Sequence, residues 1–308
     1  MKILFINYNL KIDTHNEPDI HNVFRGCSTF KELYKILFEE KIPNSQIDFC
    51  EYKDIFKIKT GYYYDNINLS DYNFVYFGFM SKYSKEAVLL MNYLTSTNVP
   101  FITYETFNVY DSKSFGMDLT ESLGYKYIPT ILTTKLNHKI LKEIENFGFP
   151  LIVKDPNIDQ GKGVFKIDNI EQLKKVFIDC GKNHLMIQKF IPNDGDNRVI
   201  VIKNKVELVV KRKMTSTTEF RSNVALGGKA VVTDLPKFVL DMCVEISKNI
   251  PVCDILGFDI IEDISDGSYY VMEINISPHI STFCAVSGVD IPGIIVNYMI
   301  EESNFAFI

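Results

Sequence analysis

The strictest demand on the fold of this chain comes from a strand that carries a carboxylate among apolar residues. In the stretch VMEINISPH, residues 271–279, Glu273 and Asn275 lie two positions apart, so a strand points both to the same face. Burying a carboxylate without a partner costs several kcal/mol, and a cation or a hydrogen-bonded ion pair normally offsets that cost. The sequence therefore predicts a positive charge beside this strand.

A second strand with a carboxylate precedes the first. The pattern LGFDIIED is followed by SDG, which predicts a three-residue hairpin loop with its glycine in the left-handed conformation. If Ile264 pairs with Ser268 across that loop, Asp259 lies directly opposite Glu273, with the side chains roughly 5 Å apart. Two facing carboxylates repel each other unless something positive lies between them.

Asp259, Glu273 and Asn275 together form a set of oxygen ligands. Two carboxylates and one amide suit a hard cation, Mg²⁺ or Mn²⁺, whose remaining ligands are water and phosphate oxygens. The alternative, which the hairpin alone does not exclude, is an ordinary solvated face of the two strands.

A glycine-containing loop follows an apolar strand in FPLIVKDPNIDQGKGVFKID. Lys154 ends the strand, and Gly161 and Gly163 allow backbone N–H groups to approach an anion closely. The loop is neither a Walker loop nor a GxGxxG motif. A solvated lysine at a strand end and a plain hairpin turn remain the alternatives.

The segment HLMIQKFIPNDGDNRVIVI predicts a strand, a loop with Pro192 and Gly195, and a return strand. Between two lobes, this connection would form a hinge whose backbone could bind the edge of a base. An ordinary connection between lobes is the alternative.

The segment KRKMTSTTEFRSNVALGGKA, residues 211–230, contains Arg212 and Arg221 among polar residues. Arginine suits bidentate contacts with carboxylate or phosphate. Taken alone, a basic segment of this kind also fits a solvated loop.

The first third of the chain alternates strands and helices, which predicts a small parallel α/β domain ending near residue 105. The helix expected over 28–40 begins with a capping box at Thr29 and Glu32. Later segments mix strands and helices as α+β. The other expected strands are 2–7, 72–80, 99–104, 149–155, 163–168 and 184–191, and the other expected helices are 84–96, 112–124, 170–181, 237–250 and 292–303.

Composition excludes some partners. The formal net charge of −6 argues against nucleic acid, which needs a basic surface. No apolar run reaches the ~18 residues that a membrane span requires. The six cysteines form no CxxC pair and no metal-ligand spacing, which predicts reduced thiols and a cytoplasmic protein.

Taken in order, these motifs resemble the ATP-grasp superfamily, specifically the RimK-type carboxylate–amine ligases. The resemblance covers roughly residues 105 to 303, and the first third looks like the α/β domain that precedes the ATP-grasp fold in this family. Its carriers are DSKSFGMDLTESLGYKYIPT, FPLIVKDPNIDQGKGV, MIQKFI, GDNRVIV, FRSNVALGGKA, GFDII and VMEINISPHI.

The order of strands and helices predicts three lobes: an N-terminal domain over 1–108, a central lobe over 109–187 and a C-terminal lobe over 188–308. The resemblance implies roles for single residues. Lys113 and Lys154 would contact the nucleotide phosphates, under the loop through Gly161 and Gly163. The remaining implied residues are Gln188, Lys189, Phe190 and Ile191 around adenine, Asp196 near the ribose, Asp259, Glu273 and Asn275 on two metal ions, and Arg212, Arg221 and Asn223 at the acyl phosphate and its carboxylate substrate.

The chain departs from the family pattern at two positions. Lys189 stands where the adenine hinge usually has Glu, and His279 stands where glycine usually follows SP. The first change leaves backbone recognition of adenine intact, and the second brings a histidine near the site, as a substrate contact or a plain loop residue. His15 and His21 fit no metal template and are interpreted as a solvated loop.

The implied reaction is ATP-dependent, ADP-forming amide formation through an acyl phosphate, with ATP, Mg²⁺ or Mn²⁺, a carboxylate and an amine as partners. Three alternatives remain: a ligase forming side-chain amide or ester links in a ribosomal peptide, an ATP-grasp kinase, and a nucleotide-binding protein without catalysis. The complete metal set argues against the last, and the FRSN…GG segment argues against the kinase. The substrates, the oligomeric state, including a homo-oligomer, and the roles of loops 11–27 and 58–68 stay open.

Overall fold

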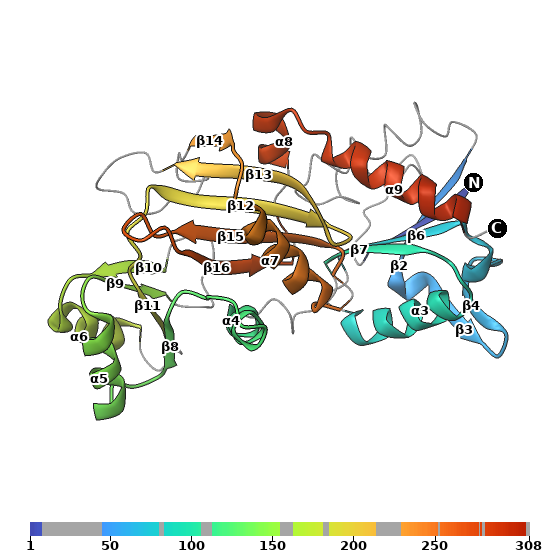
Figure 1. The fold of residues 1–308 in the computed structure, drawn as a ribbon. Helices are drawn as coiled ribbons and strands as arrows, with labels where there is room; N and C mark the ends of the chain where they lie inside the picture. The colour runs from blue at the N-terminus through green and yellow to red at the C-terminus, as the bar shows by residue number, and fades with distance from the viewer. Residues whose placement is uncertain are drawn as a thin grey trace, which may run out of the picture.

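The computed structural model describes residues 1–7, 45–79, 83–105, 113–154, 163–180, 185–213, 229–251, 253–276, 278 and 281–305, and every structural statement below concerns these residues. Their strands form four sheets. In Figure 1 the five-stranded sheet occupies the middle of the molecule, with the parallel sheet at one end and the smaller antiparallel sheet with its two helices at the other. No described helix has the length and apolar character needed to cross a membrane.

The N-terminal unit is a parallel α/β layer, as predicted. Its sheet has the order β2-β1-β6-β7, and each neighbouring pair is parallel. Parallel strands of this kind are covered on both faces, which explains their continuous apolar sequences. The elements are β1 (Lys2–Asn7), β2 (Gln46–Glu51), β6 (Phe74–Phe79), β7 (Phe101–Glu105) and α3 (Ser84–Ser96).

Residues 52–71 form a small structure that the sequence did not reveal. Two short 3₁₀ helices flank an antiparallel sheet with the order β3-β4-β5, in the region that includes the unassigned loop 58–68. The strands are β3 (Ile55–Ile58), β4 (Gly61–Tyr64) and β5 (Ile67–Asn68). The helix expected over 28–40, with its capping box, lies outside the described residues.

The central unit is an antiparallel sheet with helices on one face. Leu151, Val153, Leu185 and Ile187 pack with α5 and α6 in one core, so the alternate residues of β9 and β11 lie on the opposite face. The strand order is β10-β9-β11-β8. The elements are β8 (Thr130–Thr133), α5 (His138–Phe147), β9 (Leu151–Lys154), β10 (Val164–Ile167), α6 (Ile170–Asp179) and β11 (Leu185–Lys189).

The C-terminal unit is an antiparallel sheet with the order β14-β13-β12-β15-β16. Helix α7 packs on one face, while α8 and α9 share the other with residues of the N-terminal sheet. Helix α4 packs beside β16 (Figure 1). The elements are α4 (Lys113–Ser122), β12 (Gly195–Ile202), β13 (Lys205–Lys213), β14 (Lys229–Val232), α7 (Lys237–Lys248), β15 (Ile255–Glu262), β16 (Tyr269–Asn275), α8 (Ser281–Ser287) and α9 (Ile291–Phe305).

One hydrophobic core joins the N-terminal sheet to the C-terminal sheet. Ile3 and Phe5 of β1 belong to the same cluster as Ile200 of β12 and Ile295 of α9, and all four are buried. The core of the central unit is a separate cluster. The first and last units are therefore packed as one body, whereas the central sheet has its own core.

The hairpin between β15 and β16 corrects one step of the sequence argument. Asp263 donates its backbone N–H to Ser268, so the loop is one residue longer than the three-residue loop predicted. A bulge in the register after Asp259 restores the expected pairing, and Asp259 does lie opposite Glu273. Gly267 has φ +73°, the left-handed conformation predicted for the loop glycine.

Candidate functional site

The two predicted carboxylates meet across β15 and β16. Asp259 and Glu273 are cross-strand partners, as are Gly257 and Asn275, so the three predicted ligands lie on neighbouring positions. The Asn275 amide nitrogen donates to the Gly257 carbonyl at 3.4 Å, which orients the amide. Asp259 is buried, whereas Glu273 and Asn275 are half-buried.

Asp259 belongs to a buried network of two carboxylates and two guanidinium groups. Arg198 contacts both carboxylate oxygens of Asp259, with the second at 3.0 Å. Arg212 contacts Asp259 at 2.9 Å and also forms an ion pair with Asp196. The four formal charges cancel, which is the arrangement that buried ions require. Strands β12, β13 and β15 thus hold these four side chains in one place.

Glu273 stands outside that network. Burial raises the pKa of the Glu273 carboxyl and Asp259 raises it further, while Lys154, Lys113 and Arg198 act in the opposite direction. The net shift is upward, so the surrounding cations do not fully compensate the negative charge at this position. A further positive charge would stabilise the ionised carboxylate.

Two lysines from different elements lie close enough to Glu273 to act on its pKa. Lys113 is the first residue of α4, and Lys154 is the last residue of β9 in the central sheet. Gly116 brings α4 close to β16, because a Cβ at this position would lie 3.4 Å from the Ile274 side chain. Burial lowers the pKa of Lys154, and Lys113 lowers it further, whereas Glu273 raises it. An anion near the two lysines would relieve their repulsion.

These residues fit a divalent metal. Oxygen ligands on adjacent positions of two strands, with one carboxylate in excess, suit a hard cation. A carboxylate has roughly four lone-pair sites, so Asp259 retains acceptor capacity beside its arginines. Within the described part of the chain, no cluster of three or more His, Cys, Asp or Glu could hold a metal, so any metal here depends on Asn275 and on non-protein oxygens.

The predicted adenine residues lie where the central sheet passes into the C-terminal sheet. Gln188 is buried and donates its side-chain amide to the Thr130 hydroxyl at 3.0 Å. Lys189 is exposed, and its backbone N–H donates a hydrogen bond to the carbonyl oxygen of Pro129. The Lys166 ammonium lies over the Phe190 ring, 4.5 Å from the ring centroid. The side chains of Gln188 and Phe190 are therefore engaged within the protein.

A glycine closes the connection between the two sheets. Gly195 has φ +128°, and a Cβ there would lie 2.1 Å from the carbonyl oxygen of Arg212. Any larger residue would push apart β12 and β13 beside the Arg212–Asp196 pair. Asn193 fixes the preceding turn by accepting the Gly195 N–H at 3.0 Å.

Of the two predicted loop glycines, Gly163 is described and comes directly before β10. The following predicted residues fall on positions whose structure is not described: Gly161, Arg221, Asn223, His279, His15 and His21. Their roles stay predictions.

Sequence reasoning missed Arg198. It lies two residues after Asp196 on β12, so the alternation of a strand places both side chains on one face. Its cross-strand partner is Asp259. An arginine directly before the apolar run VIVI of a buried strand indicates a buried carboxylate partner, and that signal was available in the sequence.

Comparison with known proteins agrees with this architecture. The model of the RimK-like ATP-grasp domain matches residues 126–299, more than half of the chain. A probable alpha-L-glutamate ligase of Rhodopirellula baltica is 28% identical over 183 residues, which are 58% of this chain and 44% of that protein. A protein of the same name from Aliivibrio salmonicida is 33% identical over 164 residues, which are 52% of this chain and 52% of that protein. This chain thus spans about half the length of these curated relatives.

Among solved structures, the ATP-grasp ligase PsnB, complexed with minimal precursor, Mg and ADP, superposes with a TM-score of 0.68. The superposition covers 98% of both chains at 14% identity, so it supports the fold alone. The family match covers the central sheet, the buried network and the strand that carries Glu273. The chain therefore belongs to the RimK-like ATP-grasp family.

Proposed function

We propose that this protein is an ATP-dependent, ADP-forming ligase that activates a carboxylate as an acyl phosphate and joins it to an amine. One observation carries the proposal: Lys113 and Lys154, from two separate elements, lie close enough to Glu273 to act on its pKa, and Glu273 faces Asp259 across β15 and β16. Paired carboxylates opposed by two lysines suit phosphates and divalent metal together. Family membership supports the same reaction class.

The residues of the site have different proposed roles. Lys113 and Lys154 bind phosphate oxygens, and Asp259, Glu273 and Asn275 would hold Mg²⁺ or Mn²⁺, with two ions proposed. The bound metal would neutralise phosphate charge while the attacking and leaving oxygens align. Arg212, which Asp196 and Asp259 hold in place, lies close enough to the carboxylates to stabilise the charge of an acyl phosphate.

We place the nucleotide against the open face of the central sheet. Leu151 and Val153 of β9 pack toward the helices. Because successive residues of a strand point to opposite faces, Lys154 lies on the other face. The loop through Gly161 and Gly163 would cover the phosphates. The proposed adenine and ribose contacts are Gln188, Lys189, Phe190, Ile191 and Asp196; Arg221 and Asn223 are proposed at the carboxylate substrate.

The proposed units remain 1–108, 109–187 and 188–308, although α4 of the second range packs beside β16 of the C-terminal sheet. The last boundary falls within β11, which continues to Lys189 in the central sheet. A boundary after β11 would keep the strand whole, and residues 190–194 would then form the connection to β12.

The substrate class is the finer part of the proposal. The curated relatives are named alpha-L-glutamate ligases, which favours an amino acid or peptide as the amine. The PsnB complexes contain a precursor peptide, so a ligase that links side chains of a ribosomal peptide is the second candidate. Supplying candidate carboxylates and amines with ATP and Mg²⁺ tests the reaction: ADP, phosphate and an amide (or an ester from a hydroxyl) should form in equal amounts, and an ATP-independent product would contradict it.

Replacing Lys154 by Met should weaken binding of a non-hydrolysable ATP analogue by about 10- to 100-fold, because a charge-assisted contact to phosphate is worth roughly 1.5–3 kcal/mol. Thermal stability without ligand should change little, since burial already disfavours the charge on this side chain. Isothermal titration calorimetry with Mg²⁺ measures the affinity. Lys174→Met, an exposed lysine on α6 of the same unit, is the control and should bind normally. Equal affinity of the two variants would remove Lys154 from the phosphate site.

A further inference from the structure

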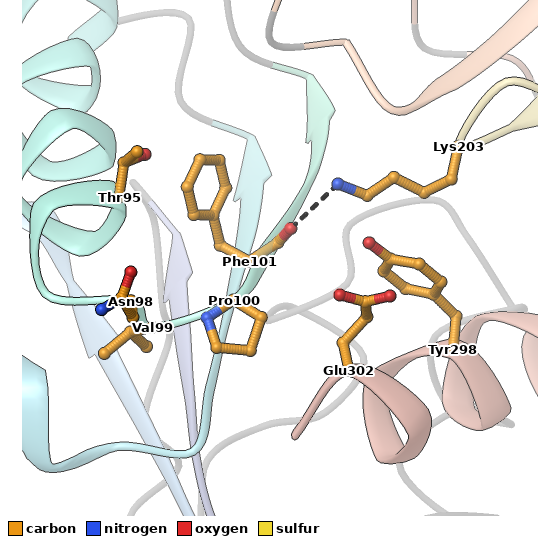
Figure 2. A pocket seen from close by; sticks show the side chains of 8 residues that line it. All are labelled: Thr95, Asn98, Val99, Pro100, Phe101, Lys203, Tyr298 and Glu302. Atoms are coloured by element: carbon orange, nitrogen blue, oxygen red, sulfur yellow. Dashed lines mark hydrogen bonds between the residues drawn. The ribbon is translucent and has the colours of Figure 1, made fainter. Parts of the chain in front are cut away.

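A pocket lies at the junction of the N-terminal and C-terminal units. Its volume is about 410 Å³, within the range of roughly 300–1,000 Å³ that small-molecule sites occupy. Figure 2 shows its walls: the end of α3 and the start of β7 on one side, α9 on another, and the turn between β12 and β13 at the rim. The residues that line it are Thr95, Asn98, Val99, Pro100, Phe101, Lys203, Tyr298 and Glu302.

The charge of the lysine at the rim is balanced within the protein. Lys203 forms an ion pair with Asp254 at 3.0 Å and donates to the Phe101 carbonyl at 3.2 Å. Burial tends to lower the pKa of the Lys203 ammonium, but Asp254 and Tyr298 raise it, so the net shift is upward. Two of the three N–H donors of this ammonium group are therefore used within the protein, and Asp254 balances its charge.

The carboxylate on the opposite wall is not engaged in this way. Glu302 of α9 is half-buried, and within the described part of the chain its carboxylate has neither an ion pair nor a hydrogen bond. In Figure 2 its carboxylate points into the space between Pro100 and Tyr298. Since Lys203 and Asp254 neutralise each other, Glu302 leaves the pocket with a net negative charge.

The end of a helix also favours a cation. Helix α3 ends at Ser96, and the last carbonyl groups of a helix carry partial negative charge, which lies beside Thr95 and Asn98. The rings of Phe101 and Tyr298 lie 5.9 and 5.2 Å from the Lys203 ammonium, so this cation of the protein already covers them. Val99 and Pro100 add an apolar floor for a short carbon chain.

We propose that this pocket binds a small organic cation, an ammonium or guanidinium group on a short apolar chain, with Glu302 as its counter-ion. The pocket is separate from the candidate active site. Lys203 follows the end of β12, five residues beyond Arg198, which corresponds to about 17 Å along a strand. Asp254 likewise precedes β15, five residues before Asp259. The pocket therefore lies at one end of these two paired strands, whereas Arg198 and Asp259 lie in their middle.

Butylguanidinium is the probe, and its neutral isostere butylurea and the anion pentanoate are the controls. Isothermal titration calorimetry on the full chain without nucleotide should show saturable binding of butylguanidinium alone, with a Kd of the order of 1 mM. Glu302→Gln removes the charge and keeps the shape, so it should weaken binding by about fivefold or more, as expected for a partly exposed charge contact. Glu301→Gln is the matched control, because Glu301 is the exposed neighbour that does not line the pocket.

A second variant, which should bind the probe more tightly, separates a loss of binding from a folding defect in Glu302→Gln. Asn98→Asp places a second carboxylate on the facing wall, and Asn98 has φ +56°, which aspartate tolerates. Equal affinity of Glu302→Gln and Glu301→Gln, or equal binding of butylurea, would overturn the proposal. Because the assay measures binding without nucleotide or turnover, its failure would leave the proposed ligase reaction untouched.

Discussion

Replacing Glu273 by Gln should lower ADP-forming turnover by at least about a hundredfold at saturating ATP and Mg²⁺, because the charge stabilisation that a metal supplies is worth several kcal/mol. Glutamine keeps the shape of the side chain and removes the negative charge opposite Asp259. Stability without ligand should stay equal or increase, since the substitution removes repulsion between two close carboxylates. Steady-state ADP release and thermal unfolding measure the two effects.

Glu262→Gln is the control for this substitution. Glu262 lies on the same strand as Asp259, opposite Tyr269, away from the predicted metal residues. Its replacement should leave turnover within about twofold of normal, as expected for a surface substitution. Near-normal turnover of Glu273→Gln at saturating Mg²⁺ would contradict the assignment of Glu273 to a metal.

Replacing Arg198 by Met should lower the free energy of unfolding by about 3 kcal/mol, the lower end of the cost of breaking a buried ion pair. Arg198 contacts both oxygens of Asp259, and both side chains are buried. Methionine cannot compensate the carboxylate, and Arg212 retains its contact, which limits the loss. Urea denaturation measures the change.

Lys211→Met provides the comparison for Arg198→Met. Lys211 also forms an ion pair with an aspartate, at 2.6 Å, but that partner, Asp194, is 58% exposed. A pair open to water contributes little, so this variant should lose less than about 1 kcal/mol. Equal losses in the two variants would mean that the buried network contributes no more than a surface pair.

The sequence predicted the elements whose pattern is local. The helix over 84–96 and the strand 149–155 that becomes β9 follow from periodicity and from flanking turn residues. The pairing of Asp259 with Glu273 was also predicted, although the loop was one residue too short. The bulge after Asp259 compensates for that error, and no local signal marks it.

Other features depend on contacts between distant segments. The hairpin formed by β3 and β4 is rich in aromatic residues and lysines without clear alternation, so its pattern did not reveal strands. Helix α5 was missed although Asn137 caps it by accepting the Ile140 N–H at 3.0 Å. The link from Arg198 through Asp259 to Arg212 joins three strands, and only tertiary structure reveals that Asp196 holds Arg212.

The proposed acyl phosphate can be trapped directly. Hydroxylamine is a small, strong nucleophile that can replace the natural amine, so the enzyme with ATP, Mg²⁺, hydroxylamine and the correct carboxylate should release ADP, phosphate and a hydroxamate in equal amounts. The phosphate of a kinase product would instead remain on a stable substrate. Formation of the hydroxamate, abolished in Glu273→Gln, is the result that the ligase proposal predicts. ADP that accumulates with a stable phosphorylated product and without hydroxamate would contradict it and support a kinase.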